Sequence, residues 1–331
     1  NWVFVLFGCA AAAALALTVD ALLALMENGL RQRPGHRRRL RIASGGAGLI
    51  ALLLAAFLPA QAGSPAKSYV VGAKTFTEQY ILAELIVQRL REAGLPATTR
   101  EGLGSSLIFE ALRADDIDVY VDYSGTLWAN QFHRADIKPR RALLSELKGM
   151  LASEKVTLLG ELGFENAYAL AMPRTRAEAL HIRSIADLAA HAPELSIAGD
   201  YEIFSRPEWA ALTKAYDLRF RAQRQMQPDF MYAAVAAGEV DVIAGYTSDG
   251  LIPKYDLVVL DDPKASIPPY DAVLLISPSR TDDARLREAL RPLLGRISID
   301  AMREANLRAA NGGEAGSVAD VARALREAIR R

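Results

Sequence analysis

The stretch Ile117-Asp118-Val119-Tyr120-Val121-Asp122-Tyr123-Ser124-Gly125-Thr126 predicts a short strand that ends in a polar turn. Its valines alternate with polar and aromatic residues, and β-branched side chains favour an extended backbone. The turn places a tyrosine ring, a hydroxyl and backbone N–H groups at the carboxyl end of a strand, where open α/β sheets tend to bind ligands. The stretch therefore predicts a binding site, and it contains no obvious catalytic group.

Length and composition indicate about two domains. The chain has 331 residues, of which 51% are hydrophobic, and a domain commonly takes roughly 150 residues. The 39 basic and 39 acidic residues balance, but basic residues concentrate between two apolar runs, a position that does not favour a nucleic-acid partner. The single cysteine, Cys9, lies in an apolar run and forms no intrachain disulfide, so the redox compartment stays open.

Two apolar runs at the start of the chain predict attachment to the cell membrane. Residues 1–30 predict a spanning helix, and residues 42–60 predict a second one or a signal-like segment. The positive-inside rule places the basic loop between them, residues 31–41, in the cytoplasm and the rest of the chain outside. Ala60-Gln61-Ala62 also fits a signal cleavage site, but the preceding spanning run favours a retained anchor.

The remainder predicts an α/β fold of two lobes. After a linker at 61–67, strands and helices alternate, which indicates mostly parallel sheets covered on both faces. The first lobe is expected at 68–172 and the second at 173–265. Residues 266–331 are expected to return to the first lobe and to end as amphipathic helices.

Helix starts are indicated by pairs of residues with the spacing of a capping box. In such a pair a short polar side chain caps the backbone N–H groups, and an acidic side chain three residues later bonds back. The pairs are Thr75 with Glu78, Ser184 with Asp187, and Ser205 with Glu208.

The sequence lacks the common catalytic and cofactor motifs. Gly72-Ala73-Lys74-Thr75 joins a predicted strand to a helix but lacks the upstream glycine and the Gly-Lys-Ser/Thr order of a phosphate loop. The four histidines show no metal-ligand spacing, and no Gly-x-Ser-x-Gly elbow occurs. We therefore expect a protein that is not an enzyme and that holds no metal or cofactor.

Tyrosines recur at the boundaries of predicted strands. One tyrosine in such a place is more often a packing residue than a ligand contact, and the spacing alone leaves both roles open. Several of them together predict a shared cleft. They are Tyr123, Tyr168, Tyr246 and Tyr270.

Seven segments resemble, in order, the substrate-binding component of osmoprotectant ABC transporters, the family that captures glycine betaine, choline, carnitine and related quaternary amines. They span residues 68–331, and together they are specific although each alone is weak. The apolar start also resembles the last spanning helix of the cognate permease, which implies a fusion of permease and binding protein. The segments are 74–79 (KTFTEQ), 122–126 (DYSGT), 166–171 (NAYALA), 204–208 (FSRPE), 238–243 (GEVDVI), 246–250 (YTSDG) and 268–271 (PPYD).

The resemblance implies a periplasmic-binding-protein fold of the second type, with the ligand held between two lobes. Two positions depart mildly from the family motifs and leave the exact ligand open: Thr75, where Asn is more frequent, and Ser124, where Thr is frequent. The implied ligand positions are an aromatic cage of Tyr123, Tyr168, Tyr246 and Tyr270, with Gln79 and Thr126 as polar partners of the ligand's other end.

The chemistry of such ligands agrees with these residue types. A quaternary ammonium has no N–H to donate, and each desolvated contact with an electron-rich ring contributes about 0.5–2 kcal/mol. The carboxylate of a betaine requires donors, which the Thr126 hydroxyl, the Gln79 amide and the N–H groups of a helix start supply. An acidic residue at position 126 would favour choline, so Thr126 indicates a range that includes carboxylated ligands.

The implied function is capture between open lobes, hinge closure and delivery to an ABC permease that works with a separate ATPase subunit. The binding domain is expected on the periplasmic or outer face of the membrane. Two alternatives stay open: a binding protein of the same fold for an amino acid or another polar solute, and an enzyme on a two-lobed scaffold.

Overall fold

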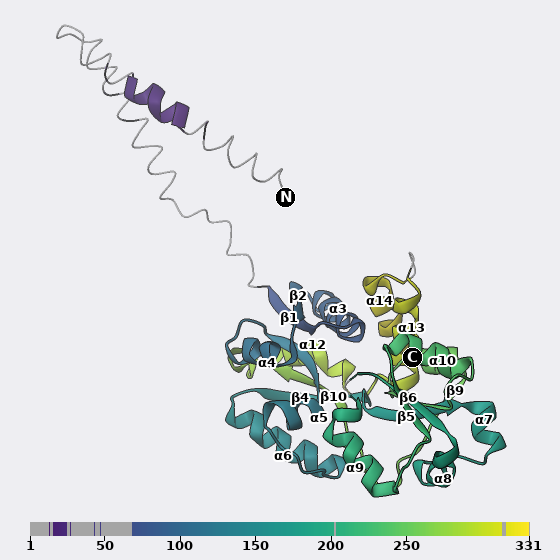
Figure 1. Cartoon of the computed structure of the whole chain (residues 1–331). Coiled ribbons are helices and arrows are strands. Elements are labelled where there is room, and N and C mark those ends of the chain that lie inside the picture. Colours follow the sequence, from purple (N-terminus) through teal and green to yellow (C-terminus); the bar gives the residue numbers. More distant parts are fainter. Residues whose placement is uncertain are drawn as a thin grey trace. The chain divides into compact units, whose positions relative to one another are not determined.

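The chain forms two compact units, Asn1–Lys67 and Ser68–Arg331 (Figure 1). In the first unit, residues 16–24 are helical. Among the residues that are described, no helix is both long enough and apolar enough to cross a bilayer. Cys9, the basic loop, the linker and most of the two expected spanning segments fall outside these residues. The computed structural model describes residues 13, 16–24, 27, 43, 47, 68–201, 203–312 and 316–330.

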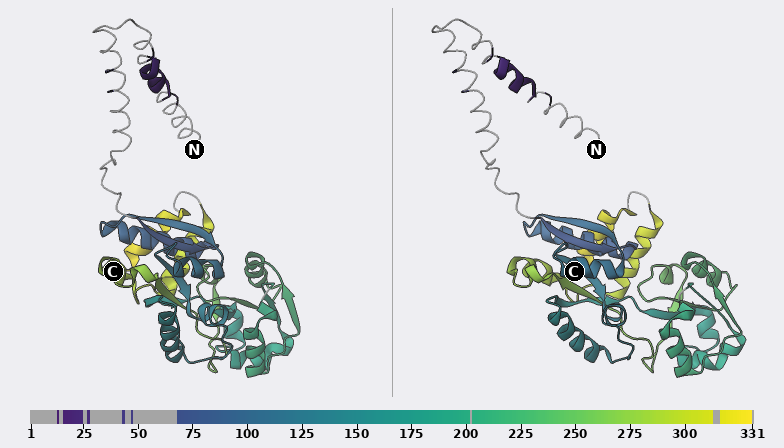
Figure 2. Two further views of the ribbon diagram at one scale, coloured as in Figure 1. Left: turned by 90° about the vertical axis from the view of Figure 1, so that its left-hand side faces the viewer. Right: turned by 60° about the vertical axis from the view of Figure 1, so that its left-hand side comes forward.

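The second unit contains two five-stranded sheets, one in each lobe (Figure 2). The first sheet has the order β2-β1-β3-β10-β4. Its β1, β2 and β3 are parallel, whereas β10 runs antiparallel to both β3 and β4. Its strands are β1 (Tyr69–Lys74), β2 (Ala97–Leu103), β3 (Val119–Tyr123), β4 (Thr157–Glu165) and β10 (Asp271–Ile276).

Helices bury both faces of the first sheet. Along β3 the side chains alternate, so Val121 packs against one helical layer and Tyr120 against the other. The layer against Val121 contains α3 (Thr77–Glu92), α12 (Ala284–Leu290), α13 (Ile299–Asn311) and α14 (Val318–Ala328). The layer against Tyr120 contains α4 (Ser105–Arg113) and α6 (Arg140–Ser153). Short turns complete the lobe: α5 (Ser124–Thr126), η1 (Leu127–Gln131), η4 (Pro278–Arg280) and η5 (Arg291–Leu293).

The second sheet has the order β7-β6-β8-β5-β9, and β5 runs antiparallel to β8 and β9. Ile197 of β6 packs toward one helical layer and Ala198 toward the other. The strands are β5 (Tyr168–Pro173), β6 (Ser196–Gly199), β7 (Ala222–Gln225), β8 (Val242–Tyr246) and β9 (Leu257–Val259). The helices are α7 (Arg174–Ala179), α8 (Ile185–His191), η2 (Ala192–Glu194), η3 (Ile203–Ser205), α9 (Pro207–Tyr216), α10 (Pro228–Ala236) and α11 (Leu251–Lys254).

The expected two-lobed α/β fold is confirmed, with two corrections. The sheets are mixed rather than mostly parallel, because each accepts a strand that arrives from the other lobe and pairs antiparallel. The expected end of the first lobe, residue 172, falls inside β5, which belongs to the second sheet. The first crossover therefore lies between Glu165 and Tyr168.

Of the three predicted capping boxes, only one forms. Ser184 accepts from the backbone N–H of Asp187, whose side chain bonds back to the cap. The Thr75 prediction is wrong because α3 begins at Thr77 after an extended Phe76. The Ser205 prediction is wrong because α9 begins at Pro207, whose fixed φ suits the first helical position and moves the start past Ser205.

Helix α13 joins the lobes, because it packs into the hydrophobic core of the first lobe and also contacts the turn after β8 in the second lobe. The Arg303 guanidinium donates to the Thr247 carbonyl at 2.8 Å, and the Asn306 amide donates to the Ser248 carbonyl at 2.9 Å. Gly250 lies directly on the α13 backbone, since a Cβ there would come within 2.4 Å of the Leu307 nitrogen. A side chain larger than hydrogen therefore cannot fit without a backbone shift.

Gly250→Ala is expected to lower the free energy of unfolding by about 1–3 kcal/mol, because the methyl group overpacks against helix backbone. Urea unfolding of residues 64–331 measures it. Gly149→Ala is the matched control: Gly149 is exposed in α6, a Cβ there meets nothing within 4 Å, and alanine is expected to raise stability by about 0.5–1 kcal/mol. Equal midpoints for the two variants would contradict the close approach.

Candidate functional site

Tyr123 ends β3 with its ring buried, only 4% exposed. Its hydroxyl donates to the Glu78 carboxylate and accepts from the Gln79 amide at 3.2 Å. Its ring stacks on Phe76 with a centroid distance of 6.2 Å. Two predicted site residues, Tyr123 and Gln79, are thus in direct contact at the start of α3.

A buried ion pair lies beside this ring. The Lys74 ammonium pairs with Asp122, and both side chains are almost fully excluded from solvent. Asp122 also accepts from the Tyr120 hydroxyl and from the Tyr123 backbone N–H, each at 2.7 Å. Since a buried charge is tolerated only when it is paired and hydrogen-bonded, this network fixes the ends of β1 and β3. The Lys74 nitrogen lies 5.6 Å from the Tyr123 ring centroid, so a cation already occupies one face.

Tyr168 and Tyr246 form an aromatic pair in the second lobe. They lie opposite each other in the β5–β8 register, with ring centroids 4.9 Å apart and an interplanar angle of 35°. The hydroxyl oxygens are 3.3 Å apart, and the Tyr246 hydroxyl donates to Asp200 at 2.9 Å. Burial raises the pKa of both phenols above the usual value of 10, so both stay neutral.

Tyr270 connects the first lobe to this pair through charged side chains. Its hydroxyl donates to Glu208 at 2.7 Å, and the Arg206 guanidinium bonds the same carboxylate at 3.0 and 3.2 Å. Arg206 also lies 5.3 Å from the Tyr168 ring centroid. Burial alone would raise the pKa of Glu208, but the hydrogen bonds from Arg206 and Tyr270 outweigh it and lower that pKa.

Thr126 lies apart from these contacts. It is half-buried in the single turn α5. Its neighbour Gly125 lies against Tyr270, since a Cβ there would come within 2.7 Å of the ring. Within residues 68–201 and 203–312, no hydrogen bond joins Thr126 to the other predicted site residues. The structure thus connects Tyr168, Tyr246 and Tyr270 into one group and Tyr123 with Gln79 into another.

Glu78 was expected only as a helix cap, and the structure places it at the centre of the second group. It is 4% exposed, and burial raises the pKa of its carboxyl above 4.5. It accepts from Tyr123, from the Asn166 amide at 3.1 Å and from the Asn306 amide at 2.8 Å. These donors come from β3, the first crossover and α13, so one carboxylate ties together the segments that border the cleft.

Other residues missed as site candidates are Asn166, Arg206, Glu208 and Asn306. All but Asn306 lie in segments that carry the family resemblance, so position within those segments was the only available signal. Hydrogen bonds that span 62 to 228 residues of sequence cannot be inferred from local spacing.

A cavity of about 550 Å³ opens beside Tyr246 and Glu78. Aromatic, amide and carboxylate groups from both lobes line it, so it can hold a cation together with hydrogen-bond donors. Its lining residues are Phe76, Thr77, Glu78, Asn166, Pro228, Tyr246, Ser248, Asp249 and Asn306.

A two-lobed fold with crossovers between the lobes and polar and aromatic groups around an interlobe cavity defines a solute-binding protein. Residues 67–327 match the family described as the substrate binding domain of ABC-type glycine betaine transport systems, and the chain belongs to that family. The expectations of a substrate-binding domain of an osmoprotectant ABC importer, and of a protein that is not an enzyme, are thereby confirmed.

Individual relatives agree with this family. The chain is 32% identical to the glycine-betaine-binding protein of Pseudomonas aeruginosa, over 64% of this chain and 72% of that protein. It is 29% identical to the ergothioneine transport permease/ergothioneine binding protein EgtU of Helicobacter pylori, over 76% of this chain but only 47% of that longer protein. The crystal structure of a glycine betaine/carnitine/choline ABC transporter matches 78% of this chain and 98% of its own, with a TM-score of 0.74 and 27% identity.

Glu208 makes the stability of the protein depend on pH. Its folded pKa lies below the ordinary value of 4.5, so its contribution is present above that pH and is lost as the pH falls through the lowered value. Glu208→Gln is therefore expected to show a smaller fall in melting temperature below pH 4.5 than the wild type. Glu194→Gln, on an exposed glutamate of the same lobe, is the control, and identical profiles for all three proteins would contradict this role.

Proposed function

We propose that the tyrosines around the cleft hold a quaternary ammonium that also carries a carboxylate, of the glycine betaine or carnitine type. The observation that carries the proposal is the Tyr168–Tyr246 pair, whose rings come together from neighbouring strands. The guanidinium of Arg206 over Tyr168 supports it, since this ring face already accepts a delocalised cation. A ligand with a methylated ammonium makes the same contact without needing hydrogen-bond acceptors.

Arg206 also favours a ligand with a carboxylate. The same guanidinium that lies over Tyr168 is half-buried and paired with Glu208. A carboxylate that enters the cleft gains a planar donor fork there, which choline cannot use. Gln79 and Thr126 remain the proposed polar partners on the first lobe, and closure about the two crossovers brings the two sets of residues together.

The second candidate is ergothioneine, because the cavity beside Tyr246 offers more acceptors than glycine betaine can use. Glu78, Asn166, Asp249 and Asn306 line it. Ergothioneine is a trimethylated amino acid whose ring carries N–H groups. These N–H groups can donate to the carboxylate and amide oxygens of the residues that line the cavity. The name of the Helicobacter pylori relative supports including it among the ligands to be tested.

Isothermal titration of residues 64–331 with glycine betaine, carnitine, choline, proline and ergothioneine tests the proposal directly. We expect heat with at least one quaternary amine that carries a carboxylate, and weaker binding of choline and proline. Absence of heat and of any thermal shift with every quaternary amine would overturn it.

Tyr168→Ala and Tyr246→Ala are each expected to weaken binding about tenfold or more, because each removes a ring face worth up to roughly 2 kcal/mol. Tyr255→Ala is the control, since its ring contacts Lys254 at 5.6 Å and lies outside the cleft groups. Tyr168→Phe and Tyr246→Phe keep the ring and are expected to retain most of the affinity. An amino-acid site, the alternative, predicts little change in any of these variants.

We further propose that the binding domain is held at the membrane and is joined to, or works with, a permease half and a separate ATPase. The apolar runs at 1–30 and 42–60 support attachment. The relative whose name combines permease and binding protein supports the fusion. Recovery of the full chain in the aqueous fraction after carbonate extraction would contradict attachment.

A further inference from the structure

A groove of about 300 Å³ on the first lobe combines an apolar floor with several arginine side chains. It lies between the carboxyl end of α3, the turn η5 and the end of α14. Its apolar floor includes Leu293 and Ile329, both buried. Five arginines line this arginine groove: Arg89, Arg291, Arg296, Arg326 and Arg330.

The carboxylates next to these arginines do not neutralise them. Glu92 alone receives three guanidinium groups, from Arg89 at 2.7 Å, Arg330 at 2.8 Å and Arg326 at 2.9 Å. A second carboxylate, Glu288, pairs with Arg291 at 3.4 Å, and Arg296 donates to the Ile329 carbonyl. Within residues 68–201, 203–312 and 316–330, the ion pairs of the groove therefore leave it with an excess of positive charge.

Two of these arginines also have a buried donor without a partner. The Nε atoms of Arg89 and Arg326 are buried and make no hydrogen bond within the described residues. These side chains are only 17% and 14% exposed. Leaving a buried donor unsatisfied is destabilising, more so when the donor is charged. An anion with several oxygens would offset the excess positive charge of the groove.

We propose that the arginine groove binds a phosphate group. A planar guanidinium fork matches two phosphate oxygens, and a dianion suits a site with several uncompensated arginines better than a single carboxylate does. The apolar floor would accommodate carbon atoms next to the phosphate. Free phosphate and the headgroup of an anionic phospholipid share this chemistry.

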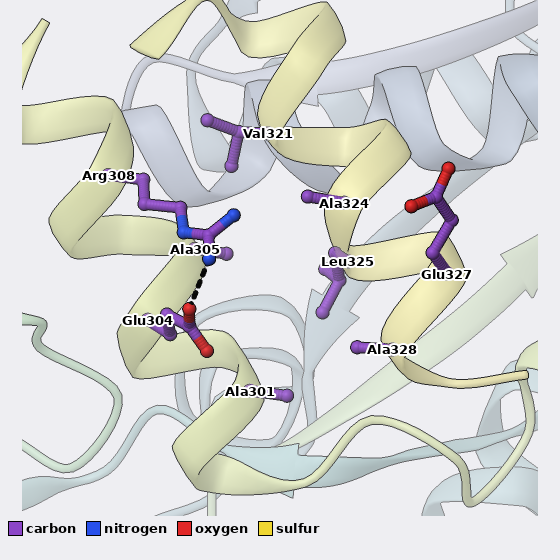
Figure 3. Close-up of a pocket in the computed structure, with 9 residues that line it drawn as sticks. All are labelled: Ala301, Glu304, Ala305, Arg308, Val321, Ala324, Leu325, Glu327 and Ala328. Atoms are coloured by element: carbon purple, nitrogen blue, oxygen red, sulfur yellow. Dashed lines mark hydrogen bonds and ion pairs between the residues drawn. The ribbon is translucent and has the colours of Figure 1, made fainter. Parts of the chain in front are cut away.

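The arginine groove is separate from the cleft. Glu78 lies in the first turn of α3 and Arg89 near its end, and the rise of a helix places eleven residues about 16 Å apart. The opposite side of α14 carries another groove, of about 280 Å³, between α13 and α14 (Figure 3). There Arg308 pairs with Glu304, and Glu327 adds a negative charge, so that groove has no positive excess.

The test uses residues 64–331, the part that contains the compact unit Ser68–Arg331. Inorganic phosphate is titrated calorimetrically, and sedimentation with phosphatidylglycerol/phosphatidylcholine vesicles is compared with pure phosphatidylcholine at low and at physiological salt. Binding of phosphate alone identifies a soluble ligand, and preference for the phosphatidylglycerol vesicles identifies a lipid headgroup. Binding to neither would overturn the proposal.

Variants distinguish binding in the arginine groove from nonspecific attraction to positive surface charge. Arg291→Gln with Arg296→Gln is expected to weaken binding about tenfold or more, whereas Arg308→Gln with Arg323→Gln, which removes the same charge from other surfaces, is expected to leave it unchanged. Arg89→Lys keeps the charge but removes the fork and its Nε, and is expected to weaken binding as well. Equal effects of the two double variants would overturn the proposal, with melting temperature and quaternary-amine affinity confirming that each variant is folded.

Discussion

The carboxylate of Glu78 is the interaction on which the arrangement around the cleft depends. It is almost fully buried, and it is stable there because three side chains donate to it. Each donor belongs to a different segment: the end of β3, the first crossover, and the helix that returns from the far end of the chain. Removing any one of them would leave buried charge or buried amide groups without partners, so the segments hold one another in place.

The group that contains Tyr168, Tyr246 and Tyr270 uses a different balance of forces. Its rings present electron-rich faces. Arg206 supplies a guanidinium over one of these rings, and Glu208 supplies the carboxylate that pairs with it. A ligand with both charges can replace these internal partners group for group, whereas a neutral solute would have to separate the ion pair without compensation. The proposed zwitterionic ligand is therefore supported on physical grounds that are independent of family membership.

Local sequence patterns predicted the elements better than their connections. Strand and helix positions followed from alternation and apolar periodicity, and Ser184 was recognised as a cap from spacing alone. The antiparallel entries of β5 and β10 were missed, because strand direction depends on which lobe a segment comes from and not on its residues. Ser205 failed as a cap because Pro207 determines where α9 starts. The tyrosines were found at strand ends, but Glu78, Arg206 and Asn306 were not recognised, since their roles arise only when distant segments meet.

The interruption of the first lobe by the second has a consequence for synthesis. Strand β10 lies between β3 and β4 and begins 106 residues after the end of β4 and 148 residues after the end of β3. It is followed by α12, α13 and α14, which help to cover one face of the sheet. While the chain leaves the ribosome, the inserted lobe has all of its strands available earlier than the lobe that began first. The nascent protein must therefore keep β1 to β4 from pairing with other chains until β10 has been made, and the cleft is complete only after α13 has also been made, because α13 supplies the Asn306 donor to Glu78.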